Sequence, residues 1–153
     1  MATLVRVFEH VAEYSRQTDE PLRWNADAPE ACLVTDDLGR AALGLRAHPD
    51  DPDPRSVVLS WDGVSYALMG LPNDEAIQQH RLYDLGLKDV DWVGIVRDSA
   101  LIAQLKPMSA ASGEPSHFVV PCKEGVVEVV AGRLDVRRLA GHPRQVASAG
   151  LEL

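Results

Sequence analysis

Residues 56–70, which read Ser-Val-Val-Leu-Ser-Trp-Asp-Gly-Val-Ser-Tyr-Ala-Leu-Met-Gly, decide the fold class of this chain. Asp62-Gly63 stands between two runs of strand-forming residues, and Asp-Gly is a preferred pair for the tight turn of a β-hairpin. We therefore expect strands over 56–60 and 64–70 that pair around this turn. Because side chains alternate along a strand, one buried face is predicted to hold Val57, Leu59, Trp61, Val64, Tyr66 and Leu68.

The same kind of pattern predicts more strands on either side of this stretch. They are the hairpin strands 31–35 and 41–46, the strand 90–96, and the hairpin strands 116–122 and 126–131, the last of which is expected to run on to Val136. Residues 48–54 contain three prolines, which deny the backbone a regular ladder. This segment is predicted to be an extended connector.

The helical signals are short. A helical period near the N-terminus is carried by Leu4, Val7, Phe8, Val11 and Ala12. Val5 and Val7 also fit a strand, so both structures stay open there. Asn73 is expected to cap a short helix that follows Pro72. Asp98 or Ser99 is expected to cap another, with its inward face formed by Leu101, Ile102 and Leu105.

Together these elements predict an α+β fold. We expect a mainly antiparallel sheet of about seven short strands, shaped as a curved roll or half-open barrel, with two or three short helices. A chain of 153 residues fits a single domain. Within it, residues 1–30 are expected to form a helix and loop lead-in, residues 31–140 the sheet core, and residues 141–153 a tail.

Composition and charge exclude several classes of function. Fifteen basic and 23 acidic residues give a net charge of −8, which repels phosphate backbones, so nucleic acid is not expected as a partner. No run approaches the ~18 apolar residues of a membrane-spanning helix, so no membrane partner is expected. Cys32 and Cys122 lie far apart in a chain without a secretory signal, which predicts two free, buried thiols and a cytoplasmic location.

One candidate site lies in the last predicted hairpin. If its loop has two or four residues, His117 and Glu128 share a face and lie within reach of each other as diagonal neighbours. Glu128 stands among valines, and a buried carboxylate needs a partner. The pair could act as general base and orienter, or as two metal ligands. The alternative is that both side chains point into solvent, as polar residues on strands commonly do.

A second group of polar residues follows the first long strand pair. Asn73, Asp74 and Glu75 are candidate ligand-binding residues, and His80 is a third candidate catalytic residue with His117 and Glu128. Helix capping is the alternative explanation for the two carboxylates, since acidic residues suit a helix N-terminus.

Metal and cofactor binding are not expected. His48-Pro49-Asp50-Asp51 matches the signature of zinc-dependent N-acetylglucosaminyl deacetylases, but Pro52 follows it and the chain contains no His-x-x-His. We therefore interpret the match as an accident of a loop rich in Asp and Pro. No phosphate-cradling glycine loop or closely spaced Cys/His set is present either.

A further pattern links these residues to other proteins. Gly70-Leu71-Pro72-Asn73-Asp74-Glu75, followed by His80, Leu82 and Gly86-Leu87, resembles a pattern in a family of small uncharacterised bacterial proteins. Those proteins also carry a His-aromatic pair and then an acidic residue in an apolar strand, as His117-Phe118 and Glu128 do here. The similarity covers about residues 57–131, and the family tends toward Gly-His-Pro-Leu where Gln79-His80-Arg81-Leu82 stands here. No activity is established for it, so the resemblance supports the fold and the choice of residues only.

Two hypotheses for the function remain. In the first, one sheet face forms a pocket for a small molecule, lined by Asn73, Asp74, His80, His117 and Glu128, with acid–base catalysis as an extension. In the second, the protein is a non-catalytic partner-binding or regulatory protein, acidic and compatible with a homo-oligomer, that uses exposed strand edges or the tail. Convergence of the five residues on a concavity would favour the first hypothesis.

Overall fold

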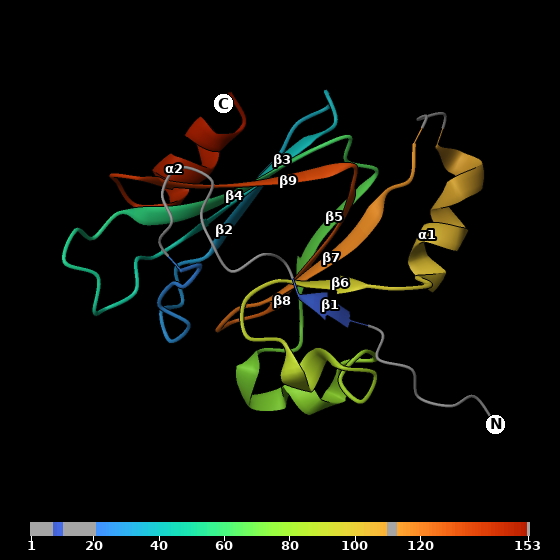
Figure 1. Ribbon diagram of the computed structural model, residues 1–153, viewed down its shortest axis with the longest axis horizontal. Helices are drawn as coiled ribbons and strands as arrows, with labels where there is room; N and C mark the ends of the chain where they lie inside the picture. Colours follow the sequence, from blue (N-terminus) through green and yellow to red (C-terminus); the bar gives the residue numbers. More distant parts are fainter. Residues whose placement is uncertain (1–7, 11–20, 110–112, 153) are drawn as a thin grey trace.

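The computed structural model describes residues 8–10, 21–109 and 113–152 (Figure 1). The strands in these residues form a five-stranded and a four-stranded antiparallel sheet, and short helices lie beside them. The α+β class and the antiparallel pairing are therefore confirmed. The strands divide between two sheets that do not close into a barrel, where the sequence predicted one curved sheet.

The first sheet has the order β1-β6-β7-β8-β5. Its strands are β1 (Phe8–His10), β6 (Gly94–Val96), β7 (Ser116–Pro121), β8 (Val126–Ala131) and β5 (Tyr66–Gly70). The second sheet has the order β2-β3-β4-β9. Its strands are β2 (Cys32–Thr35), β3 (Arg40–Leu45), β4 (Ser56–Asp62) and β9 (Arg133–Leu139). The predicted hairpins β2–β3 and β7–β8 are both present.

The hairpin predicted over residues 56–70 is wrong. β4 pairs with β3 on one side and with β9 on the other, so neither edge is left for β5, which joins β8 in the other sheet. The chain bends at Gly63, which has a φ of 64°, but the tight hairpin turn predicted at Asp62-Gly63 does not form, and the bend carries the chain from one sheet to the other. Gly132 marks a second crossing, from β8 to β9, and its N–H donates to the Asp62 carbonyl at 2.9 Å. The strand expected to run on to Val136 is broken there.

The main core lies between the two sheets. Val57, Leu59 and Trp61 of β4 are each at most 1% exposed, as predicted, and the Trp61 ring lies 6.1 Å from that of Phe118 on β7. Val64 also packs against the core, but the prediction fails for Leu68, which is 45% exposed while its neighbour Ala67 packs against the core. The change of sheet after Asp62 reverses which residues of β5 point inward.

The two ends of the chain differ from the sequence predictions. Residues 8–10 form β1 and not part of a helix, and the rest of the predicted helix lies outside the described residues. The predicted tail contains a helix, α2 (Pro143–Gly150), which packs against the four-stranded sheet (Figure 1). Val146 of α2 forms a small apolar cluster with Ala42 and Val58 of that sheet. The helix is short and rich in small residues, which is why its sequence pattern was weak.

Two other groups of helices lie beside the five-stranded sheet. One contains η1 (Asp74–Gln79) and η2 (Leu87–Asp89), and the other α1 (Ala100–Leu105) and η3 (Lys106–Met108). Asn73 caps η1 as predicted, and Ser99, of the two candidates, caps α1. The strand expected over 90–96 is shortened to β6. A second cluster of buried apolar residues, which includes Leu82 and Leu87, packs against Val119 and Val126 on the sheet face turned away from the main core.

The structure also bears on the state of the two cysteines and on membrane-spanning helices. Cys32 and Cys122 are unlinked, as expected, but only Cys122 of the two is buried, whereas Cys32 on β2 is partly exposed. Across the described ranges, no helix has the length and apolar character that crossing a membrane requires.

Candidate functional site

The register of the β7–β8 hairpin places His117 and Glu128 on one face. Pro121 pairs with Val126, which leaves a four-residue loop, so the prediction of a shared face is confirmed. His117 lies opposite Val130, and Glu128 lies opposite Val119. The two polar residues are therefore diagonal neighbours on the face turned away from the main core.

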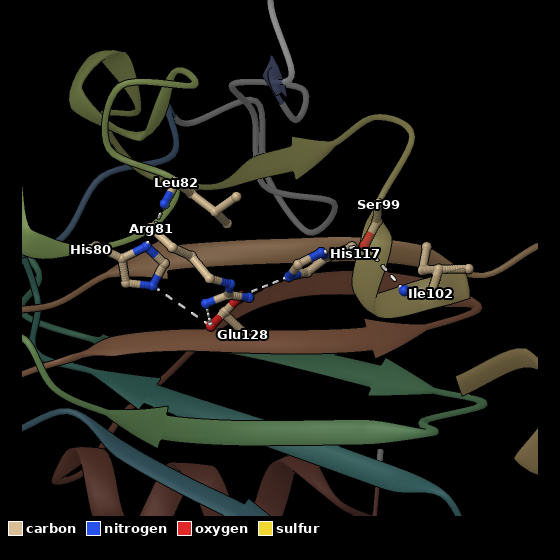
Figure 2. A network of polar contacts seen from close by, with 7 residues as sticks. All are labelled: His80, Arg81, Leu82, Ser99, Ile102, His117 and Glu128. Carbon is tan, nitrogen blue, oxygen red and sulfur yellow. Dashed lines mark hydrogen bonds and ion pairs between the residues drawn. The ribbon is translucent and has the colours of Figure 1, made fainter. Parts of the chain in front are cut away.

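His117 and Glu128 form a buried pair. Nε2 of His117 lies 2.9 Å from Oε1 of Glu128, and the two residues are 1% and 3% exposed (Figure 2). The alternative that both side chains point into solvent is wrong. An ionised carboxylate only accepts hydrogen bonds, so Nε2 of His117 carries the hydrogen of this bond.

The other nitrogen of His117 faces a serine that the sequence had suggested only as a helix cap. Oγ of Ser99 lies 2.7 Å from Nδ1 of His117. In a neutral ring whose Nε2 is protonated, Nδ1 has a free lone pair, so the Ser99 hydroxyl donates to it. The same oxygen accepts the backbone N–H of Ile102 at 3.2 Å, which is the capping bond of α1. Ser99 thus links the first turn of α1 to the imidazole.

Arg81 holds Glu128 from the opposite side. Its Nη1 and Nη2 donate to Oε2 and Oε1 of Glu128 at 2.9 and 2.6 Å, a bidentate arrangement. Burial favours the neutral form of Glu128, but the hydrogen bonds from His117 and Arg81 and the charge of Arg81 outweigh it and lower the pKa of Glu128 to about 2. Glu128 is therefore an ionised anchor and a weak base.

His80 is the third residue of the predicted catalytic group, and it reaches the same carboxylate. It ends η1, and its Nε2 lies 3.6 Å from Oε2 of Glu128. Its Nδ1 accepts the backbone N–H of Leu82 at 3.1 Å, which leaves the hydrogen on Nε2. Burial lowers the pKa of His80, and the positive charge of Arg81 adds to this effect against the attraction of Glu128. His80 is thus held as a neutral ring beside the anion.

The candidate ligand-binding residues are not brought to this network. Asn73 accepts the N–H of Ala76, and Asp74 pairs with Lys123 at 2.9 Å. Glu75 is exposed. The described contacts of Asn73 and Asp74 therefore fit helix capping and attachment of the β7–β8 loop, and the five residues do not converge on one concavity.

The two imidazoles and the carboxylate invite comparison with a metal site. Arg81 occupies both oxygens of Glu128, so a cation would have to displace the guanidinium. In the part of the chain that the structure describes, no group of three or more His, Cys, Asp or Glu residues is arranged to hold a metal ion.

A cavity of about 450 Å³ lies beside the network. Residues that line it include Gly63, Ser65, Ile102, Lys106, Glu114 and Val130. Two of them connect it to the buried pair: Ile102 donates its N–H to Ser99, and Val130 lies opposite His117 in the sheet. Ser99 and His117 are therefore direct neighbours of residues in the cavity wall.

Sequence reasoning missed Ser99 and Arg81 as members of this network. In the β6–β7 pairing Val96 lies opposite His117, and the chain turns at Asp98, with a φ of 49°, to bring Ser99 over the ring. Only the pairing of β6 with β7 carries this information. For Arg81, its position next to His80 was the available signal, since a buried carboxylate calls for a cation.

Comparisons with models of protein families, with curated proteins and with solved structures find no match for this chain. The similarity of the Pro-Asn-Asp-Glu region to small uncharacterised bacterial proteins stays a prediction. The chemistry of the residues above is the basis for a functional proposal.

Proposed function

We propose that this protein binds a small molecule in the cavity between α1 and the end of β8, and that the adjacent His117–Glu128 pair supplies acid–base chemistry to it. The observation that carries the proposal is the cavity itself, whose volume of about 450 Å³ lies in the range of small-molecule sites. A protein interface would be served by a flatter surface.

The lining suits a ligand with an apolar body and polar ends. Ile102 and Val130 provide apolar contacts, whereas Lys106 and Glu114 provide opposite charges. Ser65 adds a hydroxyl group. A few polar groups on an otherwise apolar wall are typical of sites that fix the orientation of a small ligand.

The buried network supports the acid–base part of the proposal. Glu128 is fixed by Arg81 and orients the ring of His117 through Nε2. This arrangement leaves Nδ1 as the ring atom that accepts a proton, and Nδ1 faces Ser99 at the start of α1. A histidine oriented by a carboxylate is a common general base. The unlinked cysteines agree with a cytoplasmic site of action.

A thermal-shift screen of metabolites tests the binding proposal, with Ser109→Trp as the variant that fills the cavity. Ser109 lines the cavity and is exposed, so the larger side chain is expected to occupy the site without unfolding the chain. The matched control is Ser148→Trp on the exposed face of α2. We expect a ligand that raises the Tm of the wild type and of the control but not of Ser109→Trp. A ligand that stabilises all three equally binds elsewhere and contradicts the proposal.

One observation favours a second function, the binding of a protein partner. β5 is an edge strand, residues 63–73 carry no charge, and Leu68, Met69 and Leu71 are 45%, 37% and 86% exposed. Exposed edges without charge are suited to pairing with another strand. Light scattering of the wild type and of Leu68→Lys tests this function. An oligomeric wild type and a monomeric variant would support pairing through β5. A monomeric wild type would contradict self-association through this edge.

A further inference from the structure

Ser99, His117 and Glu128 form a continuous hydrogen-bonded line. The Ser99 hydroxyl lies 2.7 Å from Nδ1 of His117, and Nε2 of the same ring lies 2.9 Å from Glu128 (Figure 2). The order is hydroxyl, imidazole, carboxylate, in which the ring can take the hydroxyl proton while the carboxylate stabilises the resulting cation. Both nitrogens of His117 are engaged, each with the group that this role requires.

We propose that Ser99 is the nucleophile of a hydrolase that acts on a small carboxylic ester held in the cavity beside α1. The inference rests on the proposed function, because it assigns a reaction to the same cavity. Ser99 is half-buried whereas His117 and Glu128 are buried, so the serine is the member of the line that is nearest to solvent.

The local backbone presents Ser99 at a sharp corner. β6 ends at Val96, Asp98 has a φ of 49°, and α1 begins at Ala100. A positive φ is uncommon for a residue other than glycine, and such conformations cluster where the surrounding structure holds a functional group in place. Nucleophilic serines of other hydrolases also lie at a turn between a strand and a helix. Here the strained residue is the one before the serine.

Glu128 acts in this proposal as a positioning residue. Arg81 binds both of its oxygens, so the carboxylate cannot turn away from the ring. Its low pKa keeps it ionised when the imidazole becomes charged. The proton therefore stays on His117 and is available to the leaving group.

The reaction is balanced with water as the co-substrate. Oγ of Ser99 bonds to the ester carbonyl carbon while its proton moves to Nδ1 of His117. The bond between the carbonyl carbon and the alkoxy oxygen then breaks, and the alcohol leaves with that proton. Water attacks the acyl-serine and gives a proton to Nδ1. The acyl–Oγ bond breaks, the proton returns to Ser99, and the sum is ester and water to acid and alcohol.

The capping bond from Ile102 gives Ser99 a structural role as well, and the experiment has to separate the two. Ser99→Asn keeps a good helix cap but has no hydroxyl. Ser148→Ala removes an exposed serine of α2 that belongs to neither the cavity nor the network. Both variants are compared with the wild type after treatment with a small alkyl fluorophosphonate, with the modified residue identified by mass spectrometry.

We expect a single adduct on Ser99 in the wild type and in Ser148→Ala, and none in Ser99→Asn of unchanged Tm. Glu128→Gln is expected to slow labelling about 100-fold or more and to move the acid limb of its pH profile to lower pH, because the imidazolium loses its stabilising carboxylate. A wild-type protein without an adduct on Ser99, or labelling of Glu128→Gln at the wild-type rate and pH profile, overturns the inference. If a ligand still binds the cavity in the thermal-shift screen, the proposed function survives that result. If no ligand binds either, both fail.

Discussion

Nε2 of His117 lies 2.9 Å from Oε1 of Glu128, with both side chains buried on the face of the five-stranded sheet that is turned away from the main core. Two residues on adjacent strands reach this distance only if the hairpin register is correct, since a slip of one residue would turn one of them to the opposite face. The pair thus ties the β7–β8 register to the chemistry of the site. The first two predictions below follow from it.

Glu128→Gln is expected to lower the free energy of unfolding by about 2 kcal/mol, the order of a lost hydrogen bond to a charged group. The loss is limited because Arg81, with a side chain 57% exposed, can return to water. Urea unfolding followed by tryptophan fluorescence measures it. Glu75→Gln, which changes an exposed carboxylate in the same region, should leave the midpoint unchanged. Equal effects of the two variants would contradict the role of Glu128 as an anchor.

The free energy of unfolding is expected to fall in two steps as the pH is lowered, the first due to His80 and the second to Glu128. The pKa of His80 is lowered in the folded protein, so the unfolded chain binds its proton first and stability decreases as the pH falls below about 6.5. The pKa of Glu128 is lowered to about 2 from an ordinary 4.5, so its contribution is present above pH 4.5 and is lost as the pH falls from there toward 2.

Free energies of unfolding measured between pH 7 and pH 3 test these steps. His80→Asn should flatten the curve directly below pH 6.5, and Glu128→Gln should flatten it below pH 4.5. A wild-type stability that rises as the pH falls through either window would be the opposite of the expected sign.

Gly44→Ala should destabilise the contact between α2 and the four-stranded sheet. A Cβ at Gly44 would overlap the backbone of Pro143, the first residue of α2, so the helix would have to move. The expected loss is about 1–3 kcal/mol, as for other overpacked sites. Gly70→Ala is the matched control, because its Cβ would meet nothing closer than 3.9 Å. Comparable Tm values for the two variants would show that α2 is not docked as described.

Trp61→Ala is expected to cost about 3–5 kcal/mol, the range for a large aromatic side chain removed from a core. Trp61 is 1% exposed and packs against Phe118 of the other sheet, so the variant opens a cavity between the sheets. Denaturant unfolding is the measurement. Leu71→Ala serves as the comparison, since Leu71 is 86% exposed and its loss should change the midpoint little.

The sequence predicted those features that depend on alternation within one hairpin. The four-residue loop after Pro121 was enough to place His117 and Glu128 on one face, because the period of a strand is two residues. The pairing of β4 required more. A strong turn signal at Asp62-Gly63 carries no information about β9, which comes much later in the chain. In the structure β9 occupies the edge of β4 that β5 was expected to use.

The site shows the same limit. Ser99 and Arg81 reach the network from segments 18 and 47 residues away from their partners in sequence. A helical or strand period reports only neighbours within one element or one hairpin, and these contacts join separate elements, so no pattern along the chain could reveal them. What could be inferred was the need of a buried Glu128 for a partner, and the structure answers that need with three: His117, Arg81 and His80.

The two crossings at Gly63 and Gly132 have a consequence for how the chain folds. β4 is completed only when β9 arrives, and β9 belongs to residues 133–139, far beyond the other strands of its sheet. The four-stranded sheet is therefore unfinished until residues 133–139 have left the ribosome. Contacts of such large sequence separation slow folding. A fragment that stops before Arg133 would expose the edge of β4, so we expect the two sheets to fold as one cooperative unit and not in succession.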